Sequence, residues 1–193
     1  MKITVGGAAA GLVFGSLTSL TNVLSSPYGE IGAHIAGSVL AKASKVLSLL
    51  LDAGWSWAAL AVAVGWVAGS RIRGALGGVA ALVAATASYY VMDLYLWDAG
   101  TDMVFWLVAG VPLGLVLGVV GAVIRQPGLP GLIAALTVPV GAAVQMVVMR
   151  PGEGLVDALP ATVAAGIVWT GAVLAAAWAL RRFWCQRRAL GAA

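Results

Sequence analysis

The densest group of polar and aromatic side chains is residues 88–98, SYYVMDLYLWD. On a helix, Asp93 shares a face with Tyr90, and Tyr89 lies one turn before the carboxylate. A carboxylate framed by aromatic rings suits a desolvated cation, because the charge and the ring quadrupoles both attract it. We therefore take these three residues as candidate ligand-binding residues. The alternative is an aromatic belt, which collects at membrane surfaces whatever the function.

Other polar or aromatic residues fall near the same ends of neighbouring hydrophobic segments. They complete the candidate ligand-binding set: Asn22, Glu30, His34, Trp57 and Gln145. Glu30 and His34 stand at i and i+4, so on a helix they would face the same ligand or proton. A buried amide such as Gln145 either bridges two helices or contacts a ligand.

The sequence carries no pattern typical of metal or catalytic sites. The one histidine and the one cysteine, Cys185, are too few for the usual metal ligand sets. No Ser-His-Asp set, Gly-x-Ser-x-Gly, His-Glu-x-x-His or phosphate-binding loop is present. We expect neither a metal nor a cofactor, and a binding role is favoured over an enzymatic one.

The composition predicts a membrane protein. Of the 193 residues, 62% are hydrophobic and 9% are charged, and the mean hydropathy is +1.01. Soluble domains carry about 25% charged residues, so lipid must solvate much of this surface. The net charge of +4 comes from scattered cations in short loops and a tail, which does not indicate nucleic-acid binding.

The hydropathy pattern predicts an all-α, single transmembrane domain of six helices. Each apolar run approaches the ~20 residues that a bilayer core requires, and only helices satisfy their backbone groups there. The expected spans are 3–24, 53–70, 75–96, 102–124, 129–149 and 159–180.

The distribution of cations predicts the orientation. If both termini are cytoplasmic, eight of the 11 Lys and Arg lie inside, as the positive-inside rule favours. They are Lys2, Arg71, Arg73, Arg125, Arg181, Arg182, Arg187 and Arg188, the last four in an expected cytoplasmic tail, 181–193. All seven acids then lie at the outer side: Glu30, Asp52, Asp93, Asp98, Asp102, Glu153 and Asp157. Lys42, Lys45 and Arg150 accompany them. We expect a multi-pass protein of the plasma membrane.

The long first outer segment, 25–52, has a partly helical apolar pattern over residues 31–51. This pattern predicts an interfacial or re-entrant helix over the outer mouth. Two roles remain open for the segment: a lid over a ligand, or a connector on the lipid headgroups.

Small residues recur every fourth position in the first span, at Gly7, Gly11 and Gly15. Such a ridge lets another helix approach closely. It predicts either packing within the bundle, with residues 110–121 as the mate, or docking of a partner membrane protein or a second copy of the chain.

Two resemblances bear on function. The run from Leu17 to Asn22, the stretch GALGGVAAL and the pair Tyr89–Tyr90 resemble a family of small actinobacterial membrane proteins without an assigned activity. The architecture is similar to the S-component of energy-coupling factor vitamin transporters. That resemblance implies six helices, an outward-facing pocket with a lid over 25–52, and docking of a coupling subunit on Gly7, Gly11 and Gly15. The family's usual alanine ridge is replaced here by glycine.

These patterns favour a membrane-embedded protein that takes up a cationic or zwitterionic small molecule from the outer side. Two other classes remain open. One is an enzyme acting on a lipid or isoprenoid, with Asp93 or Glu30 as general acid. The other is an assembly subunit without a ligand.

Overall fold

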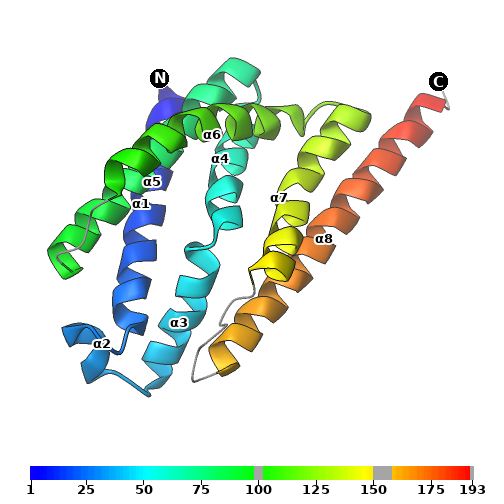
Figure 1. The fold of residues 1–193 in the computed structure, drawn as a ribbon. Coiled ribbons are helices and arrows are strands. Elements are labelled where there is room, and N and C mark those ends of the chain that lie inside the picture. Colours follow the sequence, from blue (N-terminus) through cyan, green and yellow to red (C-terminus); the bar gives the residue numbers. More distant parts are fainter. Residues whose placement is uncertain (98–101, 150–157, 192–193) are drawn as a thin grey trace.

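The computed structural model is all-helical and describes residues 1–97, 102–149 and 158–191 (Figure 1). Those ranges contain α1 (Lys2–Ser25), α2 (Glu30–His34), α3 (Val39–Leu51), α4 (Gly54–Ala68), α5 (Arg71–Trp97), α6 (Met103–Val123), α7 (Leu129–Val148) and α8 (Ala158–Gly191). Four residues of the orientation argument lie outside the described residues: Asp98, Arg150, Glu153 and Asp157.

Five helices in the described ranges are long and apolar enough to cross a bilayer, namely α1, α5, α6, α7 and α8. The predicted all-α, multi-pass membrane fold is thus confirmed. The predicted second span, 53–70, corresponds to one helix, α4, but its 15 residues are too few to qualify as a span without α3. Together α3 and α4 reach a spanning length, with a bend of 65° between them. The described residues therefore hold five candidate spans, or six if this bent pair is one.

Polar groups and a glycine mark the ends of α3 and α4. Ser38 begins α3 by accepting a hydrogen bond from the backbone N–H of Ala41. At the bend, the hydroxyl of Ser56 lies 2.7 Å from the carbonyl oxygen of Leu51 and 2.6 Å from that of Ala53. At its far end α4 stops at Gly69, whose φ of 65° suits glycine. The outer segment 25–52 thus holds two helices, α2 and α3, where one was expected.

The last helix is longer than predicted. α8 continues through the expected tail as far as Gly191. Its 34 residues give a length of about 50 Å, which exceeds the ~30 Å hydrocarbon core. One end of α8 must therefore project past the lipid tails.

The charges separate along the bundle. Figure 1 shows α1 beginning and α8 ending at the same end of the molecule, with α2 and α3 at the other. We call the first end the basic end, because the described cations outside α3 lie there: Lys2, Arg71, Arg73, Arg125, Arg181, Arg182, Arg187 and Arg188. The acids of the described residues lie toward the opposite end: Glu30, Asp52, Asp93 and Asp102.

The glycine ridge of α1 packs against α5. A Cβ added to Gly7 would lie 2.6 Å from the carbonyl oxygen of Gly77. One added to Gly11 would overlap the carbonyl of Ala81, and one at Gly15 would overlap that of Ala85. In each successive pair, the residue numbers in α1 and in α5 both increase by four, so the two helices run parallel. Their backbones lie in direct contact, as small residues permit.

This contact confirms the predicted packing of the ridge within the bundle and contradicts the alternative of a docking face. Because α5 covers Gly7, Gly11 and Gly15, which are all buried, they do not present a free docking face. The predicted mate within 110–121 is also wrong. Those glycines belong to α6, which packs on the other side of α5, where Gly114 meets Gly78 and Gly118 meets Gly74.

The remaining helices close the bundle. α4 packs on α6 where Gly65 meets the backbone of Gly118 and Gly121 meets that of Val62. α7 and α8 form a pair that reaches α3 and α4 through a cluster of buried apolar residues, Ala142, Met146 and Val168, with Leu50 and Trp55 against it.

We expect Gly11→Ala to lower the free energy of unfolding by about 1–3 kcal/mol, because the new methyl group has no space beside Ala81. Gly6 on the same helix is the matched control, since a Cβ there meets nothing within 4 Å. Gly6→Ala should be neutral or slightly stabilising. Thermal unfolding in detergent measures both, and equal stability of the two variants would contradict the α1–α5 contact.

Candidate functional site

Asp93 faces α1. Its Oδ1 accepts a hydrogen bond of 2.6 Å from the hydroxyl of Ser19, a side chain that is fully buried. Both residues lie in the last two turns of their helices, at the end opposite the basic end. The half-buried carboxylate is thereby directed at a neighbouring helix.

Asn22, one turn after Ser19, links three helices. Its Nδ2 donates to Asp52 Oδ2 at 3.1 Å and to the hydroxyl of Tyr89 at 3.3 Å, and its Oδ1 accepts from Ser48 at 2.6 Å. The amide therefore connects α1 to α5, to α3 and to the bend that follows α3.

These side chains form one group, which we call the carboxylate cluster: Ser19, Asn22, Ser48, Asp52, Tyr89 and Asp93. Asp52 and Asp93 lie close enough to repel one another, and Lys45 lies within electrostatic range of Asp52. Both negative charges lie near Tyr89. Ser19 and Asp93 form one hydrogen-bonded pair, Asn22 joins Asp52, Tyr89 and Ser48 in a second group, and the contact of Tyr89 with Asp93 connects the two.

An aromatic row borders the cluster. The ring of Tyr89 contacts Tyr90 at a centroid distance of 5.3 Å and Trp57 at 6.0 Å, and Trp57 in turn contacts Phe14 at 5.4 Å. All three contacts are edge-to-face, an arrangement favoured by the ring quadrupoles. The rings come from α1, α4 and α5, so they fix these helices around the carboxylates.

Gln145 is a helix bridge. Its Oε1 accepts a 3.0 Å hydrogen bond from the backbone N–H of Trp55, in the first turn of α4. Backbone N–H groups at a helix start lack partners in their own helix, so this side chain from α7 satisfies one of them. Among the described residues, no hydrogen bond joins Gln145 to the carboxylate cluster.

Glu30 and His34 lie on α2, outside the carboxylate cluster, and both are exposed. His34 Nδ1 lies 2.6 Å from the backbone oxygen of Glu30, so the imidazole pairs with the main chain. α2 packs on the end of α1 through Gly32, where a Cβ would overlap the carbonyl of Ser26. No described contact of either side chain joins it to Asp93.

Of the eight predicted ligand-binding residues, the structure gathers Asn22, Trp57, Tyr89, Tyr90 and Asp93, and it leaves Glu30, His34 and Gln145 elsewhere. Sequence reasoning missed Ser19, Ser48 and the pairing of Asp52 with Asn22. The signal for Ser19 was available, because it continues the four-residue spacing of the α1 glycine ridge after Gly15.

Metal binding has no evident site in the described parts of the chain. Within 1–97, 102–149 and 158–191, no three His, Cys, Asp or Glu side chains gather so as to hold an ion. The cluster's chemistry is therefore that of two carboxylates and aromatic rings.

Comparisons of the chain with protein-family models, with curated proteins and with solved structures found no match. The site must be interpreted from its own geometry.

We expect Asn22→Leu to destabilise the protein by about 1–3 kcal/mol, because Asp52, Tyr89 and Ser48 all lose a partner at once. Thr137→Val is a suitable control, since that hydroxyl bonds only the carbonyl of Ile133 one turn back in its own helix. If thermal unfolding shows no larger loss for Asn22→Leu than for the control, the hydrogen-bond network does not join the helices.

Proposed function

We propose that this protein is a membrane-embedded binding protein for a cationic or zwitterionic small molecule. The observation that carries the proposal is that Asp52 and Asp93 both lie near Tyr89 at one end of the bundle, beside a row of aromatic rings. A cation at this position would lie between two negative charges that otherwise repel one another.

The hydrogen bonds of the cluster leave its negative charge in place. Asp93 accepts from a hydroxyl and Asp52 from an amide, and both donors are neutral. A carboxylate within a membrane helix costs up to about 2.5–3.5 kcal/mol at the bilayer centre, and such residues usually pair with a cation. Lys45 offsets part of the charge at Asp52, which leaves Asp93 as the principal partner for a ligand.

The aromatic row favours an organic ammonium group. Tyr89 and Tyr90 lie beside the carboxylates, and a cation over such rings gains roughly 0.5–2 kcal/mol. Metal ions would instead need several oxygen ligands at fixed distances. The chemistry therefore supports a methylated or primary amine as ligand.

The separation of charge supports access from outside the cell. Cations concentrate at the basic end, which by the positive-inside rule is cytoplasmic. Both termini would then be cytoplasmic in the plasma membrane, and the carboxylate cluster would face outward below α2 and α3. A protein that binds solutes there fits an uptake component, for which a separate energy-coupling subunit is expected.

The resemblance to transporter S-components supports this proposal only in part. The outer segment 25–52 contributes Ser48 and Asp52 to the cluster, as a lid over a ligand would. The ridge Gly7, Gly11 and Gly15 is covered by α5, so a coupling subunit or a second copy would have to bind a different surface.

A structural role is the second candidate. The observation in its favour is that the polar side chains of the cluster are hydrogen-bonded to one another, as in a network that only joins helices. An enzyme on a lipid or isoprenoid would need Asp93 as general acid, since Glu30 lies exposed on α2.

Ligand binding is tested with choline and with the neutral alcohol in which carbon replaces its quaternary nitrogen. We expect choline to raise the unfolding temperature of the detergent-solubilised protein in a concentration-dependent manner, and the neutral analogue to have no effect. Asp93→Asn should weaken the apparent affinity about tenfold or more, because a charge-assisted contact is lost.

Glu30→Gln is the control for this experiment. Glu30 is exposed on α2, and no described hydrogen bond of its side chain joins it to the carboxylate cluster, so its variant should keep the response of the wild type. Equal responses to choline and the neutral analogue would count against a cation site. A change in stability at Asp93→Asn without any ligand response would favour the structural candidate.

Orientation is tested with cysteine labelling in intact cells. Cys185, the one cysteine of the chain, is exposed on the basic end of α8, and we expect a membrane-impermeant maleimide not to reach it. Tyr28, which is 95% exposed beyond the end of α1, should become reactive as Tyr28→Cys in a Cys185→Ser background. Labelling of Cys185 from outside would reverse the proposed orientation.

A further inference from the structure

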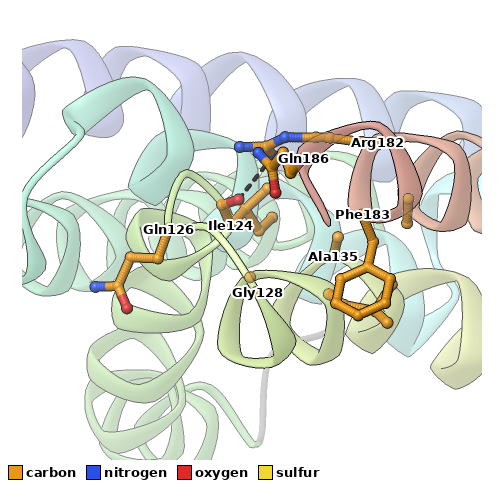
Figure 2. A pocket seen from close by; sticks show the side chains of 10 residues that line it. Ile124, Gln126, Gly128, Ala135, Arg182, Phe183 and Gln186 are labelled. Atoms are coloured by element: carbon orange, nitrogen blue, oxygen red, sulfur yellow. Dashed lines mark hydrogen bonds between the residues drawn. The ribbon is translucent and has the colours of Figure 1, made fainter. Parts of the chain in front are cut away.

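We propose that the basic end carries a binding site for the phosphate headgroup of an anionic phospholipid. The site is a hollow between the turn that joins α6 to α7 and the face of α8 (Figure 2). The hollow is shallow and open to its surroundings, so a ligand would lie at its mouth and not inside an enclosed cavity. The residues that line it are Ile124, Gln126, Gly128, Gly131, Leu132, Ala135, Ala179, Arg182, Phe183 and Gln186.

Arg182 is fixed at the hollow. Its Nη1 donates a 2.7 Å hydrogen bond to the carbonyl oxygen of Ile124, at the end of α6. A guanidinium has five N–H donors in a planar fork, so this bond orients the group and leaves further donors for phosphate oxygens. The centroid of the Trp178 ring lies 5.6 Å from the guanidinium carbon, which adds a cation–π contact.

Further donors lie beside Arg182. Figure 2 shows Gln186, one turn later on α8, next to the guanidinium, while Gln126 points away from it. Gly128, which lines the hollow, precedes the first turn of α7, and no side chain caps that helix start. Pro130 has no N–H, so the start of α7 offers the backbone N–H groups of Leu129 and Gly131, and a helix start favours an anion.

The surrounding charge favours an anion as well. Arg125, Arg181, Arg187 and Arg188 lie at the same end, and the acids of the described residues lie toward the opposite end. The electrostatic potential at the hollow is therefore positive. The hollow favours an anion, whereas the carboxylate cluster favours a cation.

Depth and apolar lining point to a lipid as the source of the phosphate. Arg182 is the 25th residue of α8, about 36 Å along the helix from its start, which matches headgroup depth on the far side of a ~30 Å core. Leu132, Ala135, Ala179 and Phe183 provide an apolar wall between α7 and α8, along which an acyl chain would lie. Basic pockets between membrane helices are suited to such headgroups.

The experiment uses the full chain, stripped of lipid in detergent, and measures the increase in unfolding temperature on adding lipid. Dioleoyl phosphatidylglycerol is compared with dioleoyl phosphatidylcholine, which has the same chains but no net charge, and with inorganic phosphate. We expect the anionic lipid to stabilise the wild type while the other two do not. Arg182→Gln should weaken the apparent affinity for the anionic lipid about tenfold or more.

Arg188→Gln is the matched control, since Arg188 is an exposed cation on the same helix outside the lining; it should keep the response of the wild type. The increase in unfolding temperature on adding lipid is measured from the lipid-free value of each variant. This separates lipid binding from the stability lost with the hydrogen bond between Arg182 and the carbonyl of Ile124. If Arg182→Gln fails to fold, Gln186→Leu replaces it and should reduce the response. Equal effects of the two lipids, equal losses at Arg182 and Arg188, an unchanged response of Gln186→Leu, or stabilisation by inorganic phosphate alone would overturn the proposal.

Discussion

The close contact of α5 with α1 on one side and α6 on the other is the constraint on which the rest of this structure depends. In lipid there is no hydrophobic drive to bring helices together, so dispersion between closely approaching backbones must replace it. Glycine at positions 7, 11 and 15 of α1 and at 114 and 118 of α6 allows that approach. Any larger side chain there would separate the helices.

The same contact positions the functional groups. Because Gly11 meets Ala81 and Gly15 meets Ala85, the next turns of the two helices bring Ser19 to Asp93 and Asn22 to Tyr89. Each of these polar groups would be costly in a membrane without a partner, and the helix contact brings each of them to one. The proposed cation site is a consequence of helix register as much as of the carboxylates themselves.

Charge then distinguishes the two ends of the molecule. One end brings Asp52 and Asp93 near Tyr89, and the other holds the described arginines, of which Arg182 lines a hollow at the end of α6. Opposite fields at the two ends suit a protein whose one end attracts a cationic solute and whose other end contacts anionic lipid. These are separate proposals, and each can fail without the other.

Much of the fold could be predicted from the sequence, because hydropathy runs follow helix length closely. The expected span 102–124 became α6 and 129–149 became α7, with shifts of one residue at their ends. The span 53–70 became α4 within two residues at each end, but the hydropathy pattern gave no sign of the bend at Asp52 that joins α4 to α3, where Ser56 hydrogen-bonds the end of α3. The mate of the α1 ridge was wrong, since Gly77, Ala81 and Ala85 have the same small size and spacing as the residues chosen.

The site was only partly predictable. Asp93 and its neighbouring tyrosines are conspicuous in an apolar chain, but Ser19 and Ser48 are not, because membrane serines more often bond their own helix backbone. Gln145 fitted a ligand contact and a helix bridge equally well in the sequence, and only its contact with Trp55 N–H separates the two.

Native mass spectrometry of protein released from its own membranes can detect a cationic solute held by Asp93. We expect an additional mass from a small, positively charged molecule on the wild type, and the loss of that mass from Asp93→Asn. Detection of the same adduct on both chains, or of no adduct on either, would contradict this role of Asp93 and leave the carboxylate cluster as a means of joining helices.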